Sequence, residues 1–234
     1  MTGKNDMHPI QGEILRVLLF NPQARFSELN ASRVPSDQFT FHVKRLVELG
    51  LISKAREHYT LTDIGKELAN RMDTDQKQMA VERQAKLGVL VVPVREKDSR
   101  CEYLVQQRLK QPFYGFHGFL TGKIRVGEKV LETAKRELEE ESGLTGQLTL
   151  TGIKHKMDYS QEGKLLEDKF FYVFRAEKVA GKLIYKFEGG RNRWLIGEEI
   201  QKLPDKFDGV EETMRMINSK ELEFVETKYT VKGF

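Results

Sequence analysis

The stretch Gly122–Leu144, GKIRVGEKVLETAKRELEEESGL, decides the fold of the second half of this chain. From Glu128 to Ser142 it contains mainly good helix formers, and Gly143 stands where a helix would end. Apolar residues recur at helical spacing and predict a buried stripe of Val130, Leu131, Ala134 and Leu138. The stretch therefore predicts one helix with an apolar and a polar face.

Three carboxylates share the polar face. Glu137, Glu140 and Glu141 fall at i, i+3 and i+4 and project from one side of the helix. Like charges at this spacing repel by roughly 0.2–0.5 kcal/mol per pair unless a cation lies among them. Hard divalent cations are bound through carboxylate oxygens and substrate phosphates. The cluster predicts a metal site that neutralises a pyrophosphate and activates water.

The alternative for an acidic helix face is simple solvation, because Glu is a good helix former. We prefer this interpretation for Glu132 and Glu139, which lie outside the cluster. Glu132 can pair with Arg136 four residues later.

The spacing of the stretch resembles the Nudix box of a hydrolase family. Its fixed positions are Gly122, Glu128, Arg136-Glu137-Leu138, Glu140-Glu141 and Gly143-Leu144. The resemblance implies a hydrolase of phosphoric anhydride bonds that uses Mg²⁺ or Mn²⁺, with Glu137, Glu140 and Glu141 on the metal. It also implies an ion pair between Glu128 and Arg136 that holds the loop on the helix, while Gly122 lets the loop backbone pass close to the metals.

A fourth acid is expected from a distant loop, as in other members of that family. In KFEGGRNRWL, residues 186–195, Glu188 precedes Trp194 by six residues. The resemblance implies that Glu188 is a fourth metal ligand or the base that activates water. The alternative is an ordinary loop glutamate, and Trp194 is expected in the core or a pocket wall.

The segment before the box, GFHGFLTGK at residues 115–123, departs from the family pattern. His117 stands at a common aromatic position, Leu120 replaces a proline and Thr121 replaces a glycine, which changes the substrate loop but not the carboxylates. The substrate-binding candidates implied by the resemblance are Arg108, Tyr114, Phe116 and Lys123. Phe113 joins the aromatic residues that would stack a base, and the alternative is a packed hairpin flap.

The remaining pattern of residues 86–234 predicts an α+β fold. Strands are expected at 87–95 and 102–108 as a hairpin, at 170–174 and at 183–187, with a closing helix at 210–217. The resemblance implies a Nudix α/β/α sandwich with a mixed sheet.

The N-terminal part predicts short helices around a hairpin. A helix at 9–20 should stop at Asn21-Pro22, Ser27 and Ser36 should cap two further helices, and strands should follow at 51–54 and 58–61. The third helix should bury Phe39, Val43, Leu46 and Val47, and a last helix after Thr62 should carry Ile64 and Leu68. This order resembles the winged helix-turn-helix domains of prokaryotic transcription regulators. We therefore predict a winged-helix domain at 1–72, a linker at 73–85 and a Nudix domain at 86–234.

Basic and polar side chains gather where such a domain would meet double-stranded DNA. The DNA-binding candidates on the third helix and the wing are Gln38, Thr40, Phe41, Lys44, Arg45, Lys54 and Arg56. The alternative is a solvated face on a domain used for dimerisation.

Composition sets the outer bounds. The net charge of +4 does not argue for nucleic acid by itself, and the single Cys101 excludes an intrachain disulfide. No apolar stretch reaches the roughly 18 residues of a membrane span, so we expect a cytoplasmic protein. The predicted function is hydrolysis of a nucleoside diphosphate linked to another moiety, in a homodimer. The runner-up is a transcriptional regulator whose Nudix domain binds a nucleotide without turning it over.

Overall fold

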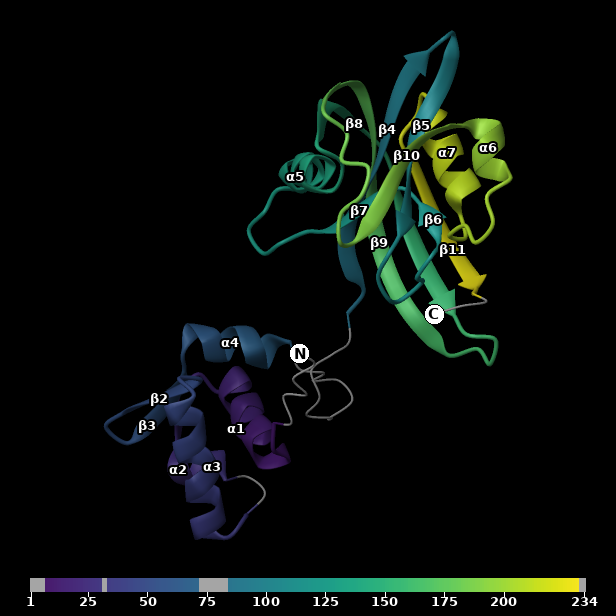
Figure 1. The fold of residues 1–234 in the computed structure, drawn as a ribbon. Coiled ribbons are helices and arrows are strands. Elements are labelled where there is room, and N and C mark those ends of the chain that lie inside the picture. Colours follow the sequence, from purple (N-terminus) through teal and green to yellow (C-terminus); the bar gives the residue numbers. More distant parts are fainter. Residues whose placement is uncertain (1–6, 31–32, 72–83, 232–234) are drawn as a thin grey trace. The chain divides into compact units, whose positions relative to one another are not determined.

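The computed structural model describes residues 7–30, 33–71 and 84–231 of the chain. It divides into two compact units, residues 1–83 and 84–234, drawn in Figure 1. Most of the predicted linker, residues 73–83, lies outside the described residues. No described helix has both the length and the apolar character of a membrane span.

The N-terminal unit combines helices with a small antiparallel sheet. Its elements are α1 (Pro9–Phe20), β1 (Ala24–Arg25), α2 (Phe26–Leu29), α3 (Ser36–Glu48), β2 (Ile52–Ala55), β3 (His58–Leu61) and α4 (Asp63–Asn70). The strands pair in the order β1-β3-β2. The predicted order of helices and hairpin is therefore confirmed, and β1 is an additional strand.

Three predictions for this unit are wrong in detail. Ser27 lies inside α2 rather than at its cap, and Ser36 is the first residue of α3, whose N-cap position is held by Pro35. Pro35 has no side-chain acceptor, so α3 begins without a side-chain cap. Val47 is exposed. His42 completes the buried stripe instead, because it lies three residues after Phe39 and four before Leu46 and so shares their face of the helix.

The hydrophobic core of this unit comes from all of its helices and the hairpin. It includes Ile14, Leu18, Phe39, Leu46 and Ile52, with Leu68 packed against it. Ile64 of α4, by contrast, is exposed, because α4 turns Gly65 and Ala69 inward instead.

The C-terminal unit is built on an eight-stranded mixed sheet. Its strands are β4 (Lys86–Lys97), β5 (Arg100–Arg108), β6 (His117–Gly118), β7 (Leu120–Lys123), β8 (Leu144–Tyr159), β9 (Leu165–Gly181), β10 (Gly190–Ile196) and β11 (Glu223–Thr230). The order is β10-β5-β4-β9-β8-β11, with parallel pairing of β4 with β9 and of β8 with β11. Residues 183–187 form no strand, contrary to prediction, and contribute only an isolated bridge between Lys186 and Arg191.

Helices cover both faces of this sheet (Figure 1). Helix α5 (Val130–Ser142) packs on one face through Ala134 and Leu138, while α6 (Gly197–Gln201) and α7 (Val210–Asn218) pack on the other. Leu131 is exposed, so the predicted stripe of α5 is wrong at this position and is completed by the buried Thr133. Gly143 ends α5 at φ 71°, as its position in the sequence predicted.

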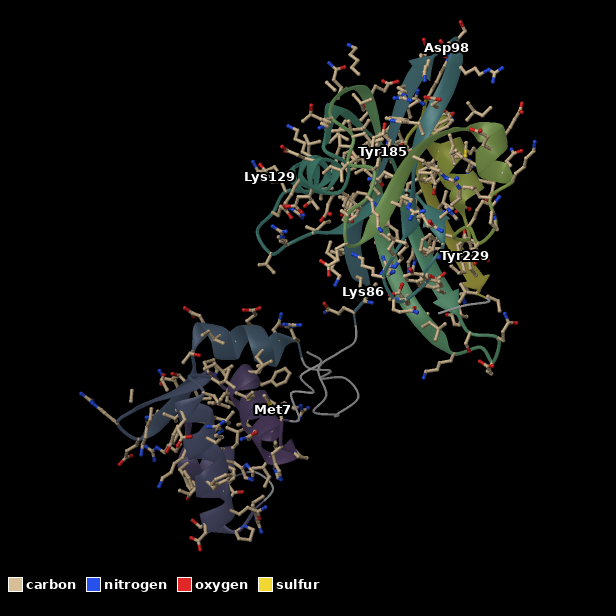
Figure 2. All side chains as sticks on the ribbon, viewed as in Figure 1. Met7, Lys86, Asp98, Lys129, Tyr185 and Tyr229 are labelled. Atoms are coloured by element: carbon tan, nitrogen blue, oxygen red, sulfur yellow. The ribbon has the colours of Figure 1, made fainter. Side chains whose placement is uncertain are left out.

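Strand β4 changes partner along one of its edges. Gly88–Val91 pair with β7, whereas Val94–Lys97 pair with β5, and Pro93 lies between the two stretches. Proline has no N–H to donate, so it suits a point where ladder pairing is interrupted. Asp98 marks the tip of the β4–β5 hairpin and Lys86 the opposite end of β4 (Figure 2).

Candidate active site

A cleft of about 650 Å³ lies beside α5 and the loop before it. Glu137 and Glu141 of α5 line it together with Gly122 of β7 and Glu167 of β9. Six basic residues line the same cleft: Lys86, Arg108, Lys110, Lys123, Arg125 and Lys169. The cleft therefore presents carboxylates among many cations, as a site for a metal-bound polyphosphate would.

Arg136 is the centre of the ion pairs on the polar face of α5. Its Nε and Nη2 donate to the carboxylate of Glu128 at 2.7 and 2.9 Å, and this pairing lowers the pKa of Glu128 to about 2. Its Nη1 donates to Glu137 at 2.6 Å and to Glu140 at 3.1 Å. The Glu128–Arg136 ion pair implied by the family resemblance is present. The predicted pairing of Glu132 with Arg136 is wrong, because Glu132 lies 4.0 Å from Lys129 instead.

Glu141 differs from the other two glutamates because its carboxyl group is largely buried. Burial raises its pKa to about 7, and the nearby charge of Glu137 acts in the same direction. Gln106 of β5 donates to its Oε2 at 3.2 Å. Asn192 of β10 donates to the backbone carbonyl of Glu141 at 2.7 Å, which fixes the end of α5 against the sheet.

Gly122 lies in close contact with Glu137. A Cβ atom at this position would fall 1.9 Å from Cδ of Glu137, so any side chain would displace the carboxylate. The absence of a side chain lets the β7 backbone run directly beside the α5 glutamates.

The donor set fits a hard divalent cation. The carboxylate oxygens of Glu137 and Glu141, next to a glycine backbone, are the type of ligand that Mg²⁺ and Mn²⁺ prefer. Within residues 7–30, 33–71 and 84–231, however, no three acidic, His or Cys side chains gather closely enough to hold an ion. The guanidinium of Arg136 pairs with both Glu137 and Glu140 in this arrangement.

The loop acid predicted from the sequence lies outside the cleft lining. Glu188 is exposed in the turn before β10, although the carbonyl of its neighbour Gly189 accepts from Leu109 near the cleft. The further acid that does line the cleft is Glu167, which pairs with Lys86 at 3.0 Å and with Lys169. Sequence reasoning missed it. The available signal was the alternation of charged residues at 154, 156, 158, 167 and 169.

The predicted substrate-binding residues separate into two groups. Arg108 and Lys123 line the cleft, and the guanidinium of Arg108 also donates to the carbonyl oxygens of Pro112 and Gln111. Tyr114 is exposed, and Phe116 packs against Phe207 at a centroid distance of 5.5 Å. Phe116 is therefore packed as in a hairpin flap, whereas the exposed Tyr114 remains a predicted substrate contact.

The DNA-binding candidates share one property in the N-terminal unit, which is that they lie at its surface. On α3, Phe41 is 64% exposed, Lys44 and Arg45 are exposed, and Arg45 pairs with Glu48 at 3.2 Å. The remaining candidates occupy α3 and the β2–β3 hairpin: Gln38, Thr40, Lys54 and Arg56.

Comparison with known proteins agrees with the C-terminal unit. Residues 85–219 match the model of the NUDIX domain. A mutator MutT protein from Bacillus halodurans is 25% identical, with a TM-score of 0.50, over 62% of this chain and 90% of that one. The NUDIX domain of Shewanella oneidensis NrtR, solved with ADP-ribose, has the same fold at 19% identity and a TM-score of 0.50, over 66% of this chain and 97% of that one. No curated protein matches the chain.

Proposed function

We propose that this chain, which belongs to the Nudix family and is a hydrolase of phosphoric anhydrides, cleaves the diphosphate of a nucleoside diphosphate linked to another moiety. The candidate substrates are ADP-ribose-like compounds, dinucleoside polyphosphates and nucleoside triphosphates. The observation that carries this proposal is the cleft in which Glu137 and Glu141 face Arg108, Lys123 and other cations.

Divalent metal ions serve Nudix enzymes generally, and we assign Mg²⁺ or Mn²⁺ to this one. Glu137, Glu140 and Glu141 would hold the metal, which supplies charge neutralisation and an activated water. Glu188 remains a proposed fourth ligand, with Glu167 as the acid already in the cleft.

The chain's own residues position the substrate. Lys123, Arg125 and Lys169 place positive charge along the cleft, where phosphate oxygens gain charge as the anhydride breaks. Burial raises the pKa of Glu141 to about 7 in the metal-free site, and a bound divalent cation would favour its ionised form, in which it can serve as a ligand. The ion pair between Glu128 and Arg136 holds the loop before α5 against that helix.

A screen of anhydride substrates with Mg²⁺ tests the proposal. ADP-ribose, diadenosine polyphosphates, sugar nucleotides and nucleoside triphosphates would be incubated with the full chain, and phosphate-bearing products measured. Cleavage of at least one that ceases with EDTA and with Glu141→Gln is the expected result. Lack of cleavage of all of them by folded protein contradicts it.

A second function has its own observation, the exposed basic surface on α3 and the β2–β3 hairpin. We propose a winged-helix domain at 1–72 that binds double-stranded DNA, a linker at 73–85 and a catalytic domain at 86–234, acting as a homodimer. Two copies related by a two-fold axis would match two half-sites. Electrophoretic mobility shift with promoter DNA from the protein's own locus tests this.

We also propose a cytoplasmic location, which the free thiol of Cys101 suits.

A further inference from the structure

A smaller chamber of about 100 Å³ adjoins the catalytic cleft. The two share six lining residues, among them Arg108, Thr121, Glu167, Lys169 and Phe171. Part of a substrate whose diphosphate occupied the cleft could therefore extend into the chamber.

The floor of the chamber is formed by buried charges on two neighbouring strands. Lys156 and Asp158 of β8 are 8% and 2% exposed, and Glu167 of β9 is 7% exposed. Lys156 pairs with Asp158 at 2.5 Å, and Lys169 pairs with Glu167. Buried ion pairs of this kind commonly add little stability compared with apolar residues of the same size, because desolvation costs offset the attraction.

The strand register makes this arrangement still less favourable for folding. Lys156 lies directly opposite Lys169, and Asp158 lies directly opposite Glu167. Like charges that face each other across two strands destabilise a sheet. A floor with two ammonium groups at one edge and two carboxylates at the other is therefore better explained by a ligand than by stability.

Lys154, the third buried lysine on β8, has a different task. It donates to the carbonyl of Gly209 at 2.7 Å and to Thr213 at 3.3 Å, and it pairs with Glu212 at 2.8 Å. An ammonium has three donors, so these partners saturate it. Lys154 therefore holds the start of α7 over the chamber, on the side opposite the floor. In the described residues, the hydrogen bonds and ion pairs of Lys156 and Lys169 each use only one donor.

The floor fits hydroxyl groups. A hydroxyl both donates and accepts, so a ring with several of them can donate to Asp158 and Glu167 while it accepts from Lys156 and Lys169. The floor carries two charges of each sign, and Arg108, Lys154 and Asp208 also line the chamber, so the lining as a whole does not single out another phosphate. The rings of Phe113 and Phe207 also line the chamber and suit the apolar face of such a sugar ring.

A stacked nucleobase fits less well. Phe113 and Phe207 pack against each other at 5.3 Å with an interplanar angle of 64°, so they form one wall rather than a flat slot. We propose that the chamber binds the sugar ring attached to the substrate's diphosphate, with Lys156 and Asp158 as specificity-determining residues. This inference rests on the proposed function and selects sugar-linked nucleoside diphosphates among its substrates.

Calorimetric binding to the full-length Glu141→Gln variant, which prevents turnover, tests the inference. The probes are ADP-ribose against ADP and UDP-glucose against UDP, each with Mg²⁺. In at least one pair the sugar-bearing ligand should bind about tenfold tighter or more, the scale of hydrogen bonds to charged groups. When Lys156→Met and Asp158→Leu are introduced together into the Glu141→Gln variant, the tighter binding of the sugar-bearing ligand should disappear. The affinity for ADP or UDP, which lack that sugar, should stay unchanged. Lys164→Met, at an exposed turn on the same hairpin, is the control and should keep the advantage.

The double substitution removes both partners of a buried pair, so its melting temperature should equal or exceed that of its parent. If it does not fold, UDP-2-deoxyglucose provides a second measurement, since the loss of one hydroxyl should weaken binding about tenfold relative to UDP-glucose. Equal binding within both pairs of probes, or an advantage that survives the double substitution, overturns the inference. If the double substitution weakens the binding of ADP and of adenosine by the same factor as that of ADP-ribose, the chamber binds the base. That result overturns the inference as well. Hydrolysis of nucleoside triphosphates without sugar-dependent binding would leave the proposed function intact. Sugar-dependent binding without hydrolysis by the wild type would support the sugar chamber and contradict the proposed hydrolytic function.

Discussion

Arg136 meets Glu128 through two hydrogen bonds, Nε to Oε1 at 2.7 Å and Nη2 to Oε2 at 2.9 Å, and so joins the loop before α5 to the helix. Bidentate contacts of this type fix geometry as well as charge.

The first prediction concerns this contact. Glu128→Gln should lower kcat/KM about 10- to 100-fold, as loss of a residue that orients metal ligands commonly does. Glu132→Gln is the control and should change little, because Glu132 contacts Lys129 at the surface. Wild-type activity in Glu128→Gln would contradict the positioning role.

The same substitution should produce a pH-dependent change in stability. The pKa of Glu128 is lowered by Arg136 from 4.5 to about 2. A depressed carboxyl pKa stabilises the fold above the unfolded value, and this contribution disappears as pH falls through the folded value. Melting temperatures of Glu128→Gln and wild type should therefore differ at pH 6 and converge between about pH 4.5 and 2. A difference that stays constant over this range would contradict the assignment.

The second prediction concerns catalysis by α5. Glu140→Gln and Glu141→Gln should each reduce turnover by orders of magnitude, since both carboxylates are assigned to the metal, whereas Glu139→Gln should not. Initial rates on any substrate found in the screen measure this. Near wild-type rates in either variant, with an unchanged circular dichroism spectrum, would contradict the site.

Glu141→Gln should also stabilise the protein when EDTA removes metal. Burial raises the pKa of Glu141 from 4.5 to about 7, so the ionised form opposes folding above the unfolded value. The melting temperature of the variant relative to wild type should rise from about pH 4.5 to 7 and then level off. A variant that is less stable than wild type at pH 8 would show that the buried carboxylate is compensated in another way.

The third prediction compares the two candidate fourth acids. Glu188→Gln should weaken the Mg²⁺ dependence of the rate if the loop before β10 closes on the complex. Glu167→Gln leaves Lys86 and Lys169 without their acid and should affect substrate KM more than the Mg²⁺ titration. An unchanged Mg²⁺ titration and rate in Glu188→Gln would remove this residue from the site.

The fourth prediction concerns the N-terminal unit. Lys44→Ala with Arg45→Ala should weaken DNA binding and flatten its dependence on salt, because two phosphate contacts are lost. Lys66→Ala is a matched control, since Lys66 lies on α4 and pairs with Asp63. Absence of DNA binding at low salt, or no effect of the double substitution, would contradict the regulator proposal and leave the hydrolase untouched.

The fifth prediction links the two units. If a nucleotide favours one arrangement of the domains, it should change DNA affinity by about 5- to 150-fold, and DNA should change nucleotide affinity by the same factor. Titrations of labelled DNA with Glu141→Gln, with and without ADP-ribose, measure this. Identical isotherms would contradict coupling through that ligand.

The sequence predicts α5 and its acidic face well because both depend on local periodicity and on a dense motif. The buried side of a helix is harder to read when polar residues pack inward, as His42 and Thr133 do in place of Val47 and Leu131. Residues 183–187 look like a strand locally but lack a partner strand to pair with along their length.

The chamber was beyond sequence reasoning for a related reason. Lys156 and Lys169 become neighbours only through the register of β8 and β9, which local patterns do not specify. Alternating charges normally indicate a solvated strand face, so their burial becomes visible only once α7 covers them.

The change of partner along β4 at Pro93 has a consequence for amide hydrogen exchange. Strand β5 is tied to β10 through seven residue pairs but to β4 through only four. The β5–β10 pair can therefore open as a unit of its own, with faster deuterium uptake than β8 and β9, which pair along most of their length. Gln106 and Asn192, the two amides that hold Glu141, belong to that unit. Each such opening would release the buried carboxyl to water, so deuterium uptake in β5 and β10 would report how often the hydrolytic site comes apart and reassembles.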